Sequence, residues 1–336
     1  MRQLRVMLVA ALTLLMAACG GGETPAATPG PAAAESVRGE RLPGRLLFVR
    51  QGVIWLWEAG AARPLLGAGE AVQPAWSPEG ERIAYIARSN SFSDLLLADR
   101  DGAALAQLTT NGSEAPPNSI ERVYASRWVF YPAWTPQGAS IVVAAQAQPP
   151  AGDPPADEPL ALAVVPTAPG EPLPLYSDAA AVIGRSAVSP DGASIIFARM
   201  GTGPEGRQQL FRLALTSGEA EPLPGAPTPS YDPAFTPDGR WLAFAARDGA
   251  DTAIFALPAE GGAPQRLTAQ GAARAPAFSP DGALLAWLAV APGEAGFDLW
   301  VADLVPSETG ALSVSTPRRL TTGLGLDGDS GLSWAP

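Results

Sequence analysis

The chain has 336 residues, enough for one large all-β domain or two smaller domains, each with an ample hydrophobic core. It contains no histidine, and all 22 of its basic residues are arginines, so a Ser-His-Asp relay, a histidine-ligated zinc site and a lysine-containing phosphate loop cannot be built from it. The formal net charge of -11 repels phosphate backbones, so we expect no nucleic-acid partner.

Residues 1–18 have the pattern of a secretory signal. Arg2 and Arg5 precede an almost wholly apolar run, which is too short to span a bilayer core of ~30 Å as a helix. The run ends in small residues directly before Cys19, and this ending resembles the bacterial lipobox. The resemblance implies that Cys19 is lipidated, and that the protein is secreted across the inner membrane and anchored by lipid in the cell envelope, in the periplasm or at the cell surface. The alternatives are a signal peptide with an incidental cysteine and a buried core segment.

Residues 19–43 are expected to form a flexible tether. After the cysteine come glycines and a stretch rich in proline, alanine and threonine, with no aromatic residue and no hydrophobic period. A single cysteine also rules out an internal disulfide. We therefore expect the folded domain to occupy residues 44–336.

From residue 44 onward the sequence repeats. Five segments share a pattern of a small residue, an aromatic or apolar residue, and Ser/Thr-Pro followed by an acidic residue or glutamine and then glycine: residues 74–80, 132–138, 186–192, 233–239 and 276–282. The Pro-Asp-Gly part favours a tight hairpin turn, because proline presets φ and glycine takes the left-handed conformation. Successive copies are offset by 58, 54, 47 and 43 residues, which indicates loop insertions in a fixed unit.

Each turn is followed by a nearly continuous apolar run that predicts a strand covered on both faces. The runs are residues 82–87, 140–145, 194–199, 241–246 and 284–289. A third strand and a short fourth strand ending in Leu-Thr follow, as in Leu108-Thr109, Leu267-Thr268 and Leu320-Thr321. Four antiparallel strands per repeat predict an all-β fold, a β-propeller.

The two ends of the repeat region predict how the propeller closes. Residues 45–50, 53–58 and 63–67 provide the second, third and fourth strands of a blade that lacks its first strand. Residues 332–336 read as that missing strand. The blade count is then six, and the ring is closed by the C-terminal strand joining the N-terminal blade, which leaves no exposed edge.

The repeat, with its Ser/Thr-Pro-Asp-Gly turn, apolar strand and terminal Leu-Thr, resembles the WD-like repeat of TolB-family propellers. Propellers of this type also occur in prolyl-oligopeptidase-type enzymes. The resemblance covers residues 44–336 and implies a fold, but not a function. TolB carries an additional N-terminal α/β domain, in whose place this sequence has only the tether.

The turns and the repeated aromatic position favour a structural interpretation. Trp76, Trp134, Phe235, Phe278 and Trp334 occupy one equivalent position, so packing between blades explains them better than a ligand stack.

A candidate binding face follows from the topology. Connections between the second and third strands, and between blades, emerge on one face, which we call the entrance face, and the insertions concentrate there. The candidate ligand-binding residues lie just before the expected first strands, at the channel mouth: Gln73, Tyr131, Arg185, Asp232 and Arg274. A solvated rim without a ligand is the alternative.

The sequence predicts a membrane-anchored envelope lipoprotein that is not an enzyme and has no catalytic residue, metal or cofactor. Its propeller would bind an envelope protein, a peptide or a glycan at the entrance face, and we expect a monomer. One alternative is a carboxylate-based glycosidase or lyase, which needs two acids but no histidine; Asp232, Glu121, Asp327 and Asp329 could lie near the ring centre, and no spacing singles out a pair. Another is a Tol-like envelope assembly component. Asp327 and Asp329 could also hold calcium, but a solvated closing loop explains them better.

Overall fold

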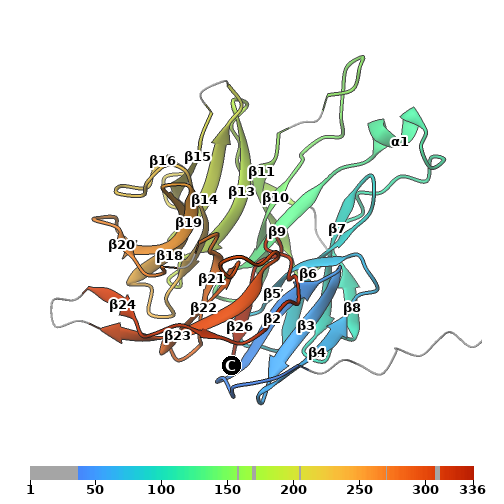
Figure 1. The fold of residues 1–336 in the computed structure, drawn as a ribbon. Coiled ribbons are helices and arrows are strands. Elements are labelled where there is room, and N and C mark those ends of the chain that lie inside the picture. Colours follow the sequence, from blue (N-terminus) through green and yellow to red (C-terminus); the bar gives the residue numbers. More distant parts are fainter. Residues whose placement is uncertain (1–36, 157–158, 169–171, 204–205, 270, 307–310) are drawn as a thin grey trace, which may run out of the picture. The chain divides into compact units, whose positions relative to one another are not determined.

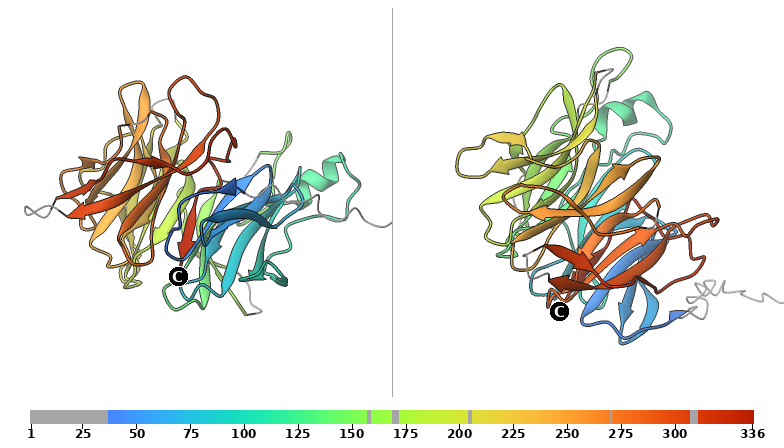
Figure 2. Two further views of the ribbon diagram at one scale, coloured as in Figure 1. Left: turned by 60° about the horizontal axis from the view of Figure 1, so that its bottom comes forward. Right: turned by 60° about the vertical axis from the view of Figure 1, so that its left-hand side comes forward.

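The computed structural model describes residues 37–156, 159–168, 172–203, 206–269, 271–306 and 311–336. Within these residues the chain forms six antiparallel sheets, which are the blades of a six-bladed β-propeller (Figures 1 and 2). The predicted fold class is confirmed. The predicted signal segment and Cys19 lie outside the described residues.

The blades are numbered here along the ring, and each has its first strand at the channel. Blade 1 contains β26 (Ser333–Ala335), β2 (Arg45–Arg50), β3 (Val53–Glu58), β4 (Ala61–Leu66) and, at its outer edge, β1 (Val37–Arg38). Blade 2 contains β5 (Ala71–Trp76), β6 (Arg82–Arg88), β7 (Ser93–Asp99) and β8 (Ala104–Gln107). Blade 3 contains β9 (Val129–Trp134), β10 (Ser140–Ala145), β11 (Ala161–Pro166) and β12 (Leu173–Tyr176).

The second half of the ring repeats this order. Blade 4 contains β13 (Ala181–Val188), β14 (Ser194–Gly201), β15 (Gln208–Ala214) and β16 (Ala220–Pro222). Blade 5 contains β17 (Ser230–Phe235), β18 (Trp241–Asp248), β19 (Asp251–Pro258) and β20 (Gln265–Arg266). Blade 6 contains β21 (Arg274–Phe278), β22 (Leu284–Ala289), β23 (Asp298–Pro306), β24 (Leu312–Val314) and β25 (Arg318–Arg319).

The C-terminal strand closes the ring as predicted. β26 pairs antiparallel with β2, with Trp334 opposite Leu46. Two side-chain hydrogen bonds tie it to its surroundings: Trp334 Nε1 donates to the Pro43 carbonyl at 2.7 Å, and Ser333 Oγ accepts from the Trp76 amide at 2.8 Å. The second bond joins blade 1 to blade 2, so the closing strand stabilises two blades.

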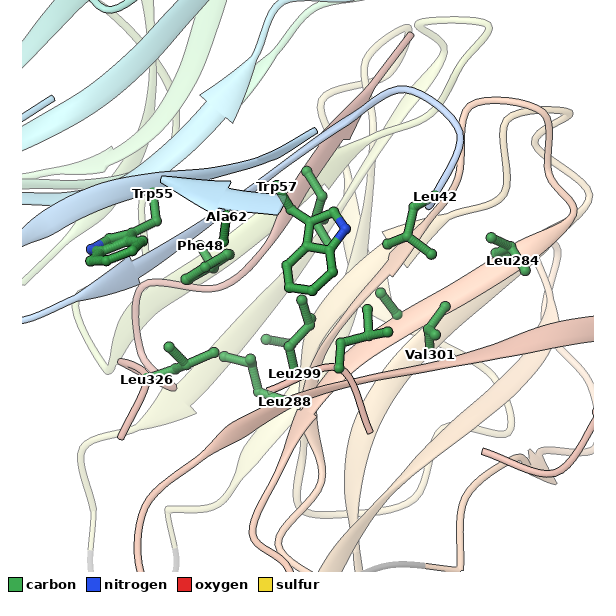
Figure 3. Close-up of a cluster of buried hydrophobic side chains, with 14 residues drawn as sticks. Leu42, Phe48, Trp55, Trp57, Ala62, Leu284, Leu288, Leu299, Val301 and Leu326 are labelled. Carbon is green, nitrogen blue, oxygen red and sulfur yellow. The ribbon is translucent and has the colours of Figure 1, made fainter. Parts of the chain in front are cut away.

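The hydrophobic core is divided among the blade boundaries. The described residues contain six buried clusters, and each draws its side chains from two neighbouring blades. This arrangement explains why the second strands are apolar on both faces, since each face packs against a different neighbour. Figure 3 shows the cluster between blades 6 and 1, where the Trp57 ring lies over Leu299 and Leu288.

The folded domain begins before residue 44, where we expected the tether to end. Val37 pairs with Ala62, and Leu42 is buried in the cluster of Figure 3. Trp57 Nε1 donates to the Glu40 carbonyl at 3.1 Å. The apolar and polar contacts offered by blade 1 therefore order a segment whose own composition carries no periodic signal.

The Ser/Thr-Pro-Asp-Gly turns are held by their own side chains. In the turn after β17, the Thr236 hydroxyl donates to Asp238 Oδ1 at 2.6 Å and accepts from the Trp241 amide at 3.0 Å. The pKa of Asp238 lies below its ordinary value, chiefly because of the Thr236 hydrogen bond. The same bonds recur around Asp191 and Asp281, as a structural role requires.

The Leu-Thr pairs fasten the outer strands. Each threonine hydroxyl accepts a hydrogen bond from a third-strand amide: Thr109 from Leu95 at 2.9 Å, Thr268 from Ile254 at 3.0 Å and Thr321 from Leu299 at 2.9 Å. A buried backbone donor is thereby satisfied where the short outer strand ends.

Helix is almost absent from the described residues. α1 (Ile120–Ala125) lies in the connection between β8 and β9, and Ser119 caps its N-terminus. The part of the chain that the structure describes has no helix that is both long and apolar enough to cross a membrane.

Candidate functional site

A bulge recurs in the first strand of the blades, at the channel mouth. Register shifts occur there in β5, β13, β17 and β21. Gln73, Tyr131, Asp232 and Ala275 adopt left-handed φ values of 53°, 56°, 53° and 54°. Left-handed backbone costs a residue with a side chain about 1 kcal/mol or more, but bulges re-aim side chains. Because the conformation recurs around the ring, it belongs to blade geometry, and the residue types at the bulge decide what the mouth can bind.

Four of the five predicted site residues lie together. Tyr131, Arg185, Asp232 and Arg274 line one cavity of about 370 Å³ at the channel mouth. Gln73 has a different role: it is buried, and its Oε1 accepts a hydrogen bond from the Tyr131 amide at 2.8 Å. Gln73 therefore joins the inner strands of blades 2 and 3. Ligand binding by these residues stays a prediction.

Asp232 is the central charge of the cavity. Its side chain is only 5% exposed and lies between two arginines, with Arg274 Nε at 3.1 Å and Arg185 Nε at 3.3 Å from its carboxylate oxygens. The Ala275 amide also donates to it, at 3.1 Å. The carboxylate is ion-paired with one arginine from each of two other blades and also accepts hydrogen bonds from Arg274 and the Ala275 amide, so it holds both arginines at the mouth.

The two arginines each lie over an aromatic ring. The Arg185 guanidinium is 5.0 Å from the ring centre of Tyr131, and that of Arg274 is 5.5 Å from the ring centre of Tyr231. Burial opposes the charge of Arg274, but the attraction and hydrogen bonds of Asp232 outweigh it, so the pKa of Arg274 lies above its ordinary value. Arg274 therefore remains cationic at any physiological pH.

Asp329 completes the site from the loop before β26. Its carboxylate oxygens lie 3.5 Å from Arg274 Nη2 and 3.4 Å from the Tyr131 hydroxyl, and its carbonyl accepts from Arg185 at 2.5 Å. The Asp329 side chain is 55% exposed. Burial raises the pKa of Tyr131, and the charge of Asp329 adds to the effect, so the phenol stays protonated and can donate a hydrogen bond.

The loop that carries Asp329 is held in place by Asp327. Asp327 accepts hydrogen bonds from the Asp329 amide at 2.9 Å and the Ser330 hydroxyl at 2.6 Å. Its own amide donates to the Val49 carbonyl of β2 at 2.9 Å. Asp327 is thus a structural residue of the closing loop, and no group of three or more acidic or cysteine side chains suited to a metal occurs among the described residues.

The sequence missed Tyr231 as a neighbour of the arginines, and it named Asp329 only as a candidate acid, without its contacts with them. The repeat does contain a signal for Tyr231. Tyr231 directly precedes the bulge residue Asp232, just as Arg274 directly precedes the bulge residue Ala275, so the two residues occupy equivalent positions. A bulge places two successive residues opposite one residue of the neighbouring strand. The position of Asp329 depends on a loop outside the repeat. Glu121, named as a candidate acid near the ring centre, was a wrong prediction: it lies in α1, away from the channel, and does not line the cavity (Figure 1).

Below the mouth, the first strands enclose a channel cavity of about 590 Å³. Arg185 and Asp232 line both cavities, so they separate the mouth from the channel. Most of the blades place a proline directly after the bulge position, which an inner edge strand tolerates. Blade 4 has Ser186 instead, and its buried hydroxyl has no hydrogen-bond partner among the described residues.

Comparison with known proteins supports the fold. No protein-family model matches the chain. The structure resembles a putative TolB from Agrobacterium tumefaciens with a TM-score of 0.57 and 16% identity, covering 90% of this chain and 97% of that one. The chain is thus a TolB-like six-bladed propeller.

Enzymes are also among the matches. The chain is 28% identical over 200 residues to the Uncharacterized peptidase YuxL of Bacillus subtilis (strain 168); the match covers 57% of this chain and spans only 25% of that protein's length. A puromycin-hydrolyzing peptidase of Mycobacterium tuberculosis matches with a TM-score of 0.50 and 17% identity, over 83% of this chain and 46% of that one. An oligogalacturonate lyase in complex with manganese matches with a TM-score of 0.50 and 15% identity, over 84% of this chain and 75% of that one.

These matches contradict our expectation that the chain is not an enzyme. The expectation rested on the missing histidine, which excludes histidine relays but leaves carboxylate chemistry open. A relative named as a peptidase, together with structures of a peptidase and a lyase, makes catalytic activity a function to be tested.

Proposed function

We propose that this chain is a lipid-anchored propeller of the bacterial cell envelope whose channel mouth binds a peptide segment. The observation that carries the proposal is the set of two arginines and two aspartates in one cavity of about 370 Å³. A peptide end carries a carboxylate or an ammonium group, and side chains add further charge. Both kinds of charge find a counterpart at this mouth.

The lengths of the contacts suggest how a ligand enters. Charge-assisted hydrogen bonds between arginine and carboxylate are typically about 2.7 to 2.9 Å, whereas Arg274 and the Asp329 carboxylate are 3.5 Å apart. Asp329 is therefore weakly held and exposed, and a ligand carboxylate would replace it at Arg274. The released Asp329 would then accept a hydrogen bond from a ligand amine.

Binding is tested by titrating charged fluorescent peptides of mixed sequence into the purified soluble domain and following anisotropy. Tyr131→Ala and Arg185→Ala should each weaken binding by about 1 to 4 kcal/mol, since aromatic and arginine residues are frequent hot spots. Gln137→Ala and Glu79→Ala, on the opposite face, are the matched controls and should bind like wild type. The proposal fails if the control variants lose binding and the mouth variants retain it.

Folding has to be measured in parallel for one of these variants. Arg185 is largely buried and ion-paired with Asp232, so its removal leaves a buried carboxylate with one arginine fewer. We therefore expect Arg185→Ala to lower the melting temperature. Asp329→Asn, at an exposed position, changes the charge of the mouth without this effect and should alter peptide preference alone.

Catalysis is the second candidate, favoured by the relative named as a peptidase. To test for catalysis, the protein is incubated with the peptides that it binds and, separately, with a panel of uronate-containing glycans, and mass spectrometry is used to detect cleavage products. Products that disappear in Asp232→Asn would establish turnover at the mouth. A Tol-like assembly role would be supported by recovery of Tol proteins in a crosslinking pull-down from intact cells.

A further inference from the structure

A second cavity of about 580 Å³ lies between blades 2 and 3, away from the channel mouth. Its walls come from the segment that follows β8, from β9 to β11, and from the segments after β10 and before β12. The volume falls within the range of about 300 to 1,000 Å³ that is usual for small-molecule sites.

The blade boundary at this cavity differs from the boundaries next to the outer strands of blades 5 and 6. Leu267 and Leu320, which follow the outer strands of blades 5 and 6, are 7% and 9% exposed and fill the boundary next to them. The equivalent Leu108 is only half-buried, and the residues of β8 are exposed. Residues from two long connections, 108–111 and Arg127 from the one before β9 and 146–148 from the one after β10, line the cavity. Inserted loops on a rigid scaffold are where binding sites are usually found.

The lining joins an apolar floor to a polar edge. Val129, Val143 and Val165 belong to the buried cluster between the two blades and form the floor. Asn111 and Gln146 contribute amide groups to the lining. A ligand seated here would therefore bury an apolar body against the valines while a polar group remains near the edge.

Arg127 supplies an uncompensated positive charge to this lining. It is half-buried, and within the described part of the chain its guanidinium makes no hydrogen bond, ion pair or ring contact. The nearby carboxylate of Asp94 is not part of the lining, and it is engaged by the Asn111 amide at 2.7 Å and the Thr109 hydroxyl at 2.9 Å. A negative group entering the cavity would meet a free arginine.

We infer that this cavity binds an amphipathic carboxylate, a small organic acid with an extended apolar body such as a medium-chain fatty acid. The apolar chain lies on the valine floor, and the carboxylate pairs with Arg127. Arginine suits this role because its planar donors match a carboxylate in two parallel hydrogen bonds. This site is independent of the peptide site proposed at the channel mouth.

Isothermal titration calorimetry with decanoate tests the inference on the purified domain. Decanoate should bind at one site per chain, whereas acetate, which has the head group alone, and decyltrimethylammonium, which has the opposite charge, should not bind measurably at the same concentrations. Arg127→Gln should weaken decanoate binding about tenfold or more, and Arg127→Lys should retain part of the affinity. Arg88→Gln, which removes a charge from an exposed position at the end of β6, is the control and should bind as wild type does.

A filled cavity provides the second measurement. Ala161→Phe places a ring in the half-buried lining of β11 and should abolish binding, with a melting curve that verifies the fold. The inference is overturned if wild type gives no heat with decanoate, if Arg127→Gln binds equally well, or if decyltrimethylammonium binds like decanoate. It is also overturned if a folded Ala161→Phe variant retains wild-type affinity.

Discussion

The threonine that follows the outer strands of blades 2, 5 and 6 allows a quantitative test of how these blades are held. In Thr321→Val the side chain keeps its shape but loses its hydroxyl, which accepts from the Leu299 amide at 2.9 Å and donates to Asp298 at 2.8 Å. Leu299 is fully buried, so its amide would lose its hydrogen bond without gaining water. An unsatisfied buried donor costs about 1 to 3 kcal/mol, and the donor lost from the buried Asp298 adds about 1 kcal/mol. We expect a loss of about 2 to 4 kcal/mol in the free energy of unfolding.

Thr268→Val is the matched comparison. Its hydroxyl accepts from the buried Ile254 amide at 3.0 Å, and within the described residues it contacts no carboxylate. The expected loss is about 1 to 3 kcal/mol, smaller than for Thr321→Val. Urea denaturation gives both values, and unchanged m-values would show that the unfolded states are comparable. The reasoning is refuted if Thr321→Val lies within about 0.5 kcal/mol of wild type, or if Thr268→Val is the more damaging change.

Three further predictions concern the closing strand, the turns and the anchor. Trp334→Ala removes the bond to the Pro43 carbonyl and a half-buried ring, and should lower the unfolding free energy by about 2 to 4 kcal/mol, whereas deletion of the exposed last residue should change little. Thr236 lowers the pKa of Asp238 in the folded state, so the ionised Asp238 stabilises the fold above about pH 4, and this stabilisation is lost as the pH falls through the folded pKa. In Asp238→Asn the free energy of unfolding should therefore depend less on pH in this range, as measured by denaturation at several pH values. Fatty-acid labelling in cells should mark the wild type and not Cys19→Ser, and equal labelling would contradict the lipid anchor.

The fold could be predicted because its information is local and repeated. Each Ser/Thr-Pro-Asp-Gly turn fixes a hairpin, and the apolar run after it must be covered on both faces. The ordered segment around Leu42 could not be predicted, because its contacts with Trp57 are long-range and its own sequence has no period. The same limit applies to β24, which extends blade 6 by pairing with the end of β23 inside an insertion.

The candidate site could be predicted in part for the same reason. Tyr131, Arg185 and Asp232 occupy equivalent repeat positions, so one argument about topology places all three at the mouth. Asp329 lies in a loop that no other blade contains, and its position depends on hydrogen bonds made by Asp327. Aligning the repeats therefore identifies the site residues that lie on the strands of the blades, but not the contacts that residues of the loops make with them.

Departures from the repeat point to the sites more directly than the repeat itself. Residue types that recur from blade to blade are explained by the common structure of the blades, whereas a residue that departs from the repeat requires a reason specific to its own position. Gly331 occupies the bulge position of blade 1, where a Cβ atom would lie 2.6 Å from Arg185 Nη1, so the missing side chain makes room for the arginine. Ser186 replaces a proline beside the channel, and Leu108 is left half-buried where its counterparts in blades 5 and 6, Leu267 and Leu320, are covered. Each departure borders one of the cavities described above, which is expected if binding, and not folding, selects the residues there.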